Sequence, residues 1–231
     1  MRLLVHAGTE KTGSSYLQTA FWAADEALVG DGIHFSTDHF QPGGRFGGVQ
    51  GDGAAVQGRL HARDDPGLIH LLRGYRRRAE GRGCTAVLLS HSALWRVLLR
   101  DGEATLCGSA AAAGFDEVSA FMFIRDPVDH AVSYYRQVVK VGRTVDRFDR
   151  WLESGYRYLE GLAEVVSESS EISWVLRMYE PHRRPLDEVV LTDWLGISPT
   201  ATRAPAGEAR VNPSLTATEA VVLASLGSQI S

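Results

Sequence analysis

The sequence reads His6-Ala7-Gly8-Thr9-Glu10-Lys11-Thr12-Gly13-Ser14-Ser15-Tyr16-Leu17-Gln18 directly after a short apolar run, Leu3–Val5. The apolar run, the glycine-containing turn and the apolar residues at helical spacing predict a strand over 2–7 and a helix over 14–28. The first turn of such a helix offers unpaired N–H groups and the positive end of the helix dipole, which attract anions. Lys11 adds a cationic side chain. The stretch therefore predicts a binding site for a phosphate or sulfate group.

Composition places the chain among globular α/β proteins and argues against several classes of function. The 231 residues, 44% of them hydrophobic, suit one domain with a sizeable core. The formal net charge of −4 does not fit a nucleic-acid partner. Cys84 and Cys107 provide no disulfide framework and no metal-ligand spacing, and no apolar stretch is long enough to span a membrane. We expect a cytoplasmic protein with no metal, no membrane span and no nucleic-acid partner.

Strand and helix patterns alternate along the rest of the chain. Strands are predicted over 33–35, 85–89, 118–124 and 172–178, and helices over 67–80, 103–113, 127–141, 146–154, 158–168, 185–195 and 216–226. Residues 36–66 are rich in Gly, Asp, His and Arg and are predicted to form a mobile loop or lid. The alternation predicts an α/β fold: a single domain over 1–231 with a mostly parallel central sheet flanked by helices.

Three groups of polar residues follow predicted strands, at the edge where parallel sheets bind ligands. They are the turn over 8–15, the tripeptide Ser90-His91-Ser92, and Arg125. Pro127 is expected to start a helix, and Ser133 lies two turns into it. The Arg fork and the Ser hydroxyl together would suit a second phosphate group.

The first turn differs from the phosphate-binding loop of ATPases and kinases. That loop has the order G-x-x-x-x-G-K-[ST], whereas Lys11 precedes Gly13 here. Asp126 follows a predicted strand as a Walker B carboxylate would, but Arg125 and Pro127 on either side fit that role poorly. A P-loop-type kinase or NTPase is therefore the weaker hypothesis.

Together the two motifs resemble the bacterial-type sulfotransferases that use 3′-phosphoadenosine 5′-phosphosulfate (PAPS). The resemblance rests on Lys11-Thr12-Gly13-Ser14-Ser15 after the first strand and on Arg125-x-Pro127-x-x-x-x-x-Ser133-x-Tyr135 after a later one. Further similar landmarks are 133–137, 148–152, 175–180, 193–197 and 211–215, so the resemblance covers most of the chain. It implies a P-loop NTPase-like sulfotransferase fold. Relatives commonly continue well beyond the last of these landmarks, so a missing C-terminal segment is one expectation.

The resemblance also implies a role for each motif residue. Lys11 would contact the bridging oxygen and the 5′-phosphate, and it would stabilise charge on the leaving group. The phosphosulfate would be cradled through backbone and hydroxyl hydrogen bonds by Thr12, Gly13, Ser14 and Ser15. Arg125 and Ser133 would hold the 3′-phosphate. The sulfuryl group would pass from PAPS to a hydroxyl or amine acceptor and leave adenosine 3′,5′-bisphosphate (PAP), without a metal.

The acceptor of such a reaction also needs a base. Bacterial relatives often carry Ser-Ser-Glu after the strand that corresponds to residues 85–89. This chain has Ser90-His91-Ser92, so that Ser92 replaces the expected Glu. His91 is the predicted base because imidazole titrates near neutrality, and His34 and His39 are its rivals.

Three functions stay open on these residues. The first is a PAPS-dependent sulfotransferase that acts on a small-molecule or carbohydrate acceptor. The second is a non-catalytic nucleotide-binding domain of the same fold, and the third is the weaker kinase or NTPase. Arg203 and Arg210, in a late loop, are further candidates for contact with the 3′-phosphate, as in some relatives.

Overall fold

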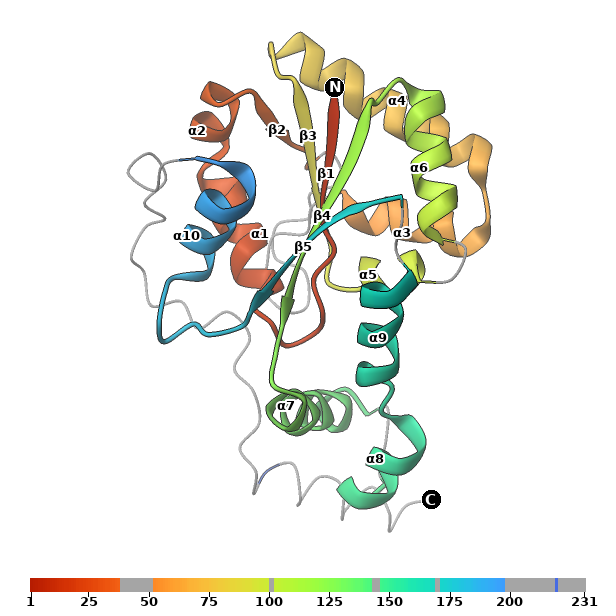
Figure 1. Cartoon of the computed structure of the whole chain (residues 1–231), viewed down its shortest axis with the longest axis vertical. Coiled ribbons are helices and arrows are strands. Elements are labelled where there is room, and N and C mark those ends of the chain that lie inside the picture. Colours follow the sequence, from red (N-terminus) through yellow and green to blue (C-terminus); the bar gives the residue numbers. More distant parts are fainter. Residues whose placement is uncertain (38–51, 100–101, 143–145, 169–170, 198–218, 220–231) are drawn as a thin grey trace.

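The computed structural model describes residues 1–37, 52–99, 102–142, 146–168, 171–197 and 219 (Figure 1). Several predictions fall outside these residues. They concern the first part of the expected lid, the helix over 216–226, and the side chains of His39, Arg203 and Arg210.

Five parallel strands form the central sheet of the described residues. They are β1 Arg2–His6, β2 Ile33–Phe35, β3 Ala86–Ser90, β4 Glu117–Ile124 and β5 Ser173–Met178. Their order is β2-β3-β1-β4-β5, so the chain moves to one side of β1 first and to the other side after β3. The predicted α/β fold is confirmed. In sheets of this kind the crevice beyond the carboxyl ends, where the strand order reverses, is the usual place for a ligand.

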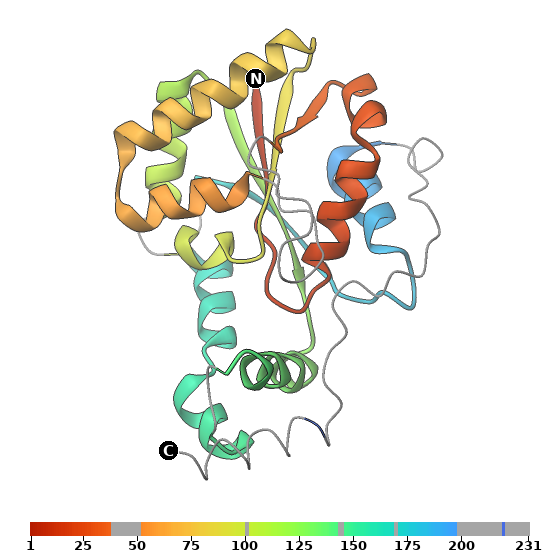
Figure 2. The ribbon, with the colours of Figure 1, turned by 180° about the vertical axis from the view of Figure 1, so that it is seen from behind.

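Helices cover both faces of this sheet (Figures 1 and 2). One face carries α1 Ser14–Ala23, α2 Asp25–Gly30, α10 Leu186–Val190 and a π-helical turn over Leu191–Leu195. The other face carries α3 Gly53–Ala62, α4 Asp65–Gly81, α5 Leu94–Leu98, α6 Gly102–Ala113 and α9 Tyr158–Glu168. Beyond the carboxyl ends of the strands lie α7 Pro127–Lys140 and α8 Phe148–Gly155. Among the described residues, no helix combines the length and the apolar composition needed to cross a lipid bilayer.

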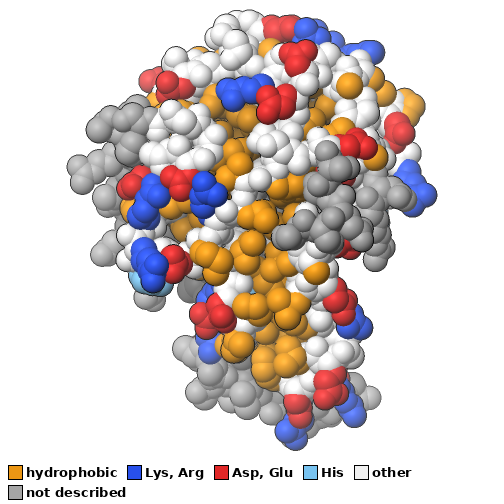
Figure 3. Space-filling view, viewed as in Figure 1, with side chains coloured by type: hydrophobic (Ala, Val, Ile, Leu, Met, Phe, Trp, Pro, Cys, Tyr) orange, Lys and Arg blue, Asp and Glu red, His pale blue; other side chains and the backbone are white. Residues whose placement is uncertain are grey.

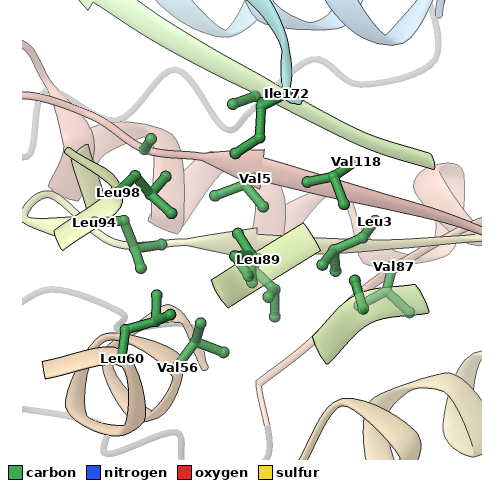
Figure 4. Close-up of a cluster of buried hydrophobic side chains, with 14 of the residues drawn as sticks. Leu3, Val5, Val56, Leu60, Val87, Leu89, Leu94, Leu98, Val118 and Ile172 are labelled. Atoms are coloured by element: carbon green, nitrogen blue, oxygen red, sulfur yellow. The ribbon is translucent and has the colours of Figure 1, made fainter. Parts of the chain in front are cut away.

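The alternation of side chains along β1 divides the core into two clusters. Leu3 and Val5 point to the face of α3 to α6, where they pack with Val56, Leu60 and other buried side chains (Figure 4). Leu4, between them in sequence, belongs to the second cluster, under α1 and α10. Because all three side chains are at most 2% exposed, the strand is buried on both faces, as its unbroken apolar run predicts.

The mobile loop predicted over 36–66 is wrong for its second half. Residues 53–62 form the helix α3, in which Val56 and Leu60, four residues apart, are buried in the first core cluster. Before it, the buried Asp52 carboxylate accepts a hydrogen bond of 2.5 Å from the Ser36 hydroxyl. A Cβ atom at Gly53 would lie 2.7 Å from the Ser90 carbonyl, so glycine allows the helix to approach the end of β3.

The other helix predictions hold with local differences. The helix expected over 14–28 is interrupted at Ala24, which separates α1 from α2. The helix expected over 185–195 exists, but its second half widens into the π-helical turn before it ends at Gly196, which has a φ of 72°. The short helix α5 was not predicted. The helix expected from Pro127 begins there, as α7.

Exposed apolar side chains gather over α7 and α9, beyond the end of the sheet (Figure 3). The large hydrophobic residues exposed on these elements include Val128 and Leu159. Met178, the last residue of β5, is also 56% exposed. None of the described residues that line the pocket described below lies on α9, although Gln137 of α7 does line it.

Candidate active site

The carboxyl ends of the central strands lie side by side at one edge of the sheet, and the loops that follow them are hydrogen-bonded to one another. His6, the last residue of β1, is in register with Ser90 of β3 and with Phe121 of β4. The His91 N–H donates to the His6 carbonyl at 3.2 Å. The Trp95 N–H donates to the Ala7 carbonyl at 3.1 Å. The structure therefore brings together the loops that follow the strands predicted over 2–7 and 85–89.

The loop between β1 and α1 has a backbone shape suited to an anion. Lys11 has a φ of 64° and Gly13 has a φ of 80°, both in the left-handed region. Such a conformation is sparsely populated by a residue like lysine and is found most often at functional sites. Left-handed residues next to right-handed ones turn successive N–H groups toward one concave side. Among the described residues, no side chain caps the N-terminus of α1, whose first N–H groups have no partner within the helix.

Hydrogen bonds from two threonine hydroxyls to backbone carbonyl groups stabilise the shape of this loop. The Thr12 hydroxyl donates to the Thr9 carbonyl at 2.7 Å, and the Thr9 hydroxyl donates to the Phe123 carbonyl at 3.2 Å. Both threonines are fully buried. The Thr12 side chain therefore shapes the loop, which differs from the ligand-binding hydroxyl expected there. Ser15, by contrast, is exposed.

Arg125 joins the second motif to this loop. Its Nη1 donates to the Lys11 carbonyl at 2.9 Å, and its Cζ lies 5.3 Å from the centre of the Tyr179 ring. The Arg125 backbone N–H donates to the Tyr158 hydroxyl at 3.0 Å. A guanidinium group carries five N–H donors, and the bond to Lys11 uses one of them. The loop after β1 and the residue after β4 therefore lie in direct contact, as predicted from their positions beyond the carboxyl ends of the strands.

Helix α7 continues the second motif. The Asp126 carboxylate accepts hydrogen bonds from the N–H groups of Val128 and Asp129, at 3.0 and 3.1 Å. It caps the helix, and this contact gives no support to a Walker B role. Ser133 is half-buried and lies one turn before Gln137, on the same side of α7. Gln137 lines the pocket described next.

A pocket of about 640 Å³ opens at the loop, within the size range of small-molecule sites. Its described lining residues are Glu10, Lys11, Gly13, Ser14, Ser15, Tyr16, Ser92, Gln137, Tyr179, Pro181, Pro185 and Leu186. Of the predicted site residues, four line it: Lys11, Gly13, Ser14 and Ser15. The predicted residues that lie outside this lining are Thr12, His91, Arg125 and Ser133. Arg125 nevertheless contacts two residues of this lining, Lys11 and Tyr179.

Positive charge gathers beside this pocket although the chain as a whole is acidic. Burial lowers the pKa of the Lys11 ammonium, and the neighbouring charges of Arg125 and Lys140 lower it further. A lowered pKa from cationic neighbours means that another positive charge is disfavoured there. The same potential favours an anion.

His6 lies beneath the loop in a fully buried position. One ring nitrogen, Nδ1, lies 2.7 Å from the Ser90 hydroxyl. The other, Nε2, finds no hydrogen-bond partner among the described residues, and a Cβ atom at Gly8 would lie 3.0 Å from it. Burial, with a smaller effect of His91, lowers the pKa of His6 to about 3. The ring is therefore neutral at physiological pH and supports the loop without a charge.

The surroundings of His91 count against its predicted role as the base. The Ala93 N–H donates to His91 Nδ1 at 3.3 Å, so a neutral ring carries its proton on Nε2. Burial also lowers the pKa of the imidazole. Nε2 is then a hydrogen-bond donor. The rival His34 is bonded through Nδ1 to Arg82, which lies before β3 and away from the pocket.

Glu10 is a site residue that the sequence argument missed. Its Oε2 accepts a hydrogen bond from Trp95 Nε1 at 3.2 Å, and its Oε1 lies 3.1 Å from Arg96 Nη2. Its backbone carbonyl lies 2.9 Å from His130 Nε2. The signal was present, since Glu10 directly precedes Lys11 in the quoted stretch. Tyr179 was also missed as a pocket residue, although it follows the last predicted strand.

Comparison with protein-family models gave no match. Comparisons with curated proteins and with solved structures gave no match either.

Proposed function

We propose that this chain is a sulfotransferase that moves the sulfuryl group of PAPS to a hydroxyl or amine acceptor. The observation that carries the proposal is the 2.9 Å hydrogen bond from Arg125 to the Lys11 carbonyl. It couples a loop suited to one anionic group to an arginine suited to another. A ligand with two separate anionic groups, as in a 3′,5′-substituted adenosine nucleotide, fits this pairing.

The first anionic group would bind at the start of α1. Backbone N–H groups from Gly13 to Ser15 and the dipole of α1 offer a cradle that needs no metal. The ammonium group of Lys11 would neutralise charge on the phosphate oxygen that leaves when the S–O bond breaks. Sulfuryl transfer, like phosphoryl transfer, requires in-line positioning and donors where charge develops.

The second anionic group would bind beyond β4. The remaining N–H donors of Arg125 suit the 3′-phosphate, and Ser133 lies on the side of α7 that carries the pocket-lining Gln137. The Tyr179 ring, on which the guanidinium stacks, limits the rotation of Arg125. A preorganised arginine loses less conformational entropy when it binds an anion.

The second candidate function is nucleotide binding without catalysis. The hydrogen bond from Ala93 to His91 Nδ1 favours it, because it leaves the predicted base with a proton on Nε2. The two candidates share the nucleotide site and differ only in turnover.

Calorimetric titration tests the shared site. PAP should bind to the wild-type protein without Mg²⁺ and more tightly than ATP with Mg²⁺. The variants Lys11→Ala and Arg125→Ala should each weaken PAP binding about tenfold or more, since hydrogen bonds to charged groups contribute about 1.5–3 kcal/mol. The exposed Arg77 on α4 provides a matched control, because Arg77→Ala removes the same charge at a distance from the pocket.

The outcomes separate the candidates. Tighter binding of ATP with Mg²⁺ than of PAP would contradict the sulfotransferase and favour a kinase or NTPase. Undiminished PAP affinity in both site variants would show that the nucleotide binds elsewhere. If PAP binds as expected, transfer of labelled sulfate from PAPS to a panel of acceptors then distinguishes the enzyme from the non-catalytic domain.

A further inference from the structure

We infer that Glu10 is the general base of this site and takes the proton from the acceptor hydroxyl; the inference rests on the proposed function. Glu10 is the residue before Lys11, whose ammonium would face the leaving oxygen. Among the described residues that line the pocket, Glu10 is the one with a carboxylate. We therefore assign to Glu10 the role of the Glu that is expected at position 92, where this chain has Ser.

Two neighbours hold the Glu10 carboxylate in place. Trp95 Nε1 donates to one oxygen at 3.2 Å, and Arg96 Nη2 lies 3.1 Å from the other. Both neighbours lie on α5, which follows the loop after β3. A carboxylate has about four lone-pair positions, so these two contacts leave acceptor capacity for a substrate hydroxyl. The side chain also keeps 21% of its surface exposed, so a substrate can reach it.

The region behind Glu10 fixes this arrangement. The Trp95 ring is buried, and Gly161 of α9 packs so closely on it that a Cβ atom there would overlap the ring. The Arg96 guanidinium stacks on the rings of Trp95 and Tyr134, with its Cζ 5.5 Å from each ring centre. A base held by packed aromatic side chains keeps its geometry without ordering cost at the moment of reaction.

The step balances in atoms, electrons and protons. The acceptor oxygen forms a bond to sulfur while the bond between sulfur and the bridging phosphate oxygen breaks. The electron pair of the broken bond stays on that phosphate oxygen, beside Lys11. The proton of the acceptor hydroxyl passes to the Glu10 carboxylate, which releases it to water after the product leaves.

The test uses water as the acceptor, so it does not depend on knowing the natural substrate. The full-length protein is incubated with ³⁵S-labelled PAPS, and the release of labelled sulfate is measured alongside PAP binding by calorimetry. The variant Glu10→Gln keeps an oxygen that can accept the Trp95 hydrogen bond, but it removes the base. Arg96→Gln breaks the ion pair and leaves the carboxylate, and His91→Asn removes the rival base.

The inference predicts three results. All variants bind PAP within about threefold of the wild-type affinity, because none of the three residues belongs to the proposed PAP contacts. Glu10→Gln lowers the rate of sulfate release by about 100-fold or more, as expected for loss of a general base. Arg96→Gln and His91→Asn each lower the rate of sulfate release by less than about tenfold.

Other results overturn the inference and stay distinguishable from failure of the proposed function. A loss of less than about 100-fold in Glu10→Gln excludes Glu10 as the base, and so does an equal loss in Arg96→Gln, which would indicate a structural role. If PAP binds but the wild-type protein transfers sulfate neither to water nor to any acceptor of the panel, Glu10 has no catalytic role and the non-catalytic domain is favoured. If only an acceptor of the panel receives sulfate, the same variants are compared with that acceptor. If PAP does not bind to the wild-type protein, the proposed function fails, and the inference fails with it.

Discussion

Replacing Gly13 by alanine should destabilise the fold at the loop that carries the proposed nucleotide site. Gly13 has a φ of 80°, and a residue with a side chain costs about 1–2 kcal/mol in that conformation. The new Cβ atom would also overlap Leu186 Cδ1, and Leu186 is only 7% exposed, so it has little room to move. Overpacking of this kind adds about 1 kcal/mol or more. We therefore expect Gly13→Ala to lower the free energy of unfolding by about 2–4 kcal/mol.

Urea-induced unfolding measures this loss, read from a lower midpoint at an unchanged slope. For a chain of this size the loss corresponds to a Tm about 5–15 °C lower. Gly58 is exposed in the interior of α3, and a Cβ atom added there would meet no atom of the described residues within 4 Å, so it is the matched control. The same exchange there should raise the free energy of unfolding by about 0.5–1 kcal/mol. Equal stabilities of Gly13→Ala and the wild-type protein, or a destabilising Gly58→Ala, would refute the reasoning.

Three further predictions address the surroundings of the site. Asp126→Ala removes the cap of α7 and should lower the free energy of unfolding by about 1 kcal/mol, whereas Asp126→Asn should retain most of it; chemical denaturation decides, and equal losses would contradict the capping role. The folded pKa of His6, about 3, lies below the ordinary value of 6.5, so the unfolded chain binds the proton first and stability should fall as the pH drops from 6.5 toward 3. His6→Asn should flatten this slope in denaturation curves taken between pH 4 and 7, with the exposed His70→Asn as the matched control, and an unchanged slope would count against the assignment. Gly161→Ala should displace the buried Trp95 and lower Tm by several degrees, and no shift would show that α9 adjusts freely.

Strand β1 could be predicted from sequence because it is buried on both faces. Leu3, Leu4 and Val5 form an uninterrupted apolar run, and no helical pattern competes with it. The start of α7 could also be predicted from sequence, since proline is favoured at the first position of a helix and the preceding Asp126 is a favourable N-cap residue. These signals are local and do not depend on the rest of the chain.

Helix α3 could not be predicted in the same way. Its glycines disfavour a helix by propensity, and its buried face consists of few residues, chiefly Val56 and Leu60. What stabilises it is tertiary: contact with the first core cluster and the close approach of Gly53 to Ser90. Those partners lie far away in sequence, so a local pattern did not reveal them.

For the site, the sequence predicted which loops meet but not what each side chain does. Because both follow parallel strands, the first loop and Arg125 were correctly predicted to lie close together. The internal hydrogen bond of the Thr12 hydroxyl and the proton position on His91 depend on individual angles and distances, which motif spacing does not encode. Glu10 was overlooked although it directly precedes Lys11, because the side chains that hold its carboxylate, Trp95 and Arg96, lie 85 and 86 positions further along the chain.

The central claim is that one ligand spans the Lys11 loop and Arg125, and a comparison of two nucleotides tests it most directly. Calorimetry without Mg²⁺ should show that the wild-type protein binds PAP about tenfold or more tightly than adenosine 5′-phosphate, because only PAP has a 3′-phosphate for Arg125. Arg125→Ala should abolish this preference, whereas Lys11→Ala should weaken both nucleotides by a similar factor. Equal wild-type affinities for the two nucleotides, or a preference that survives Arg125→Ala, would contradict the account.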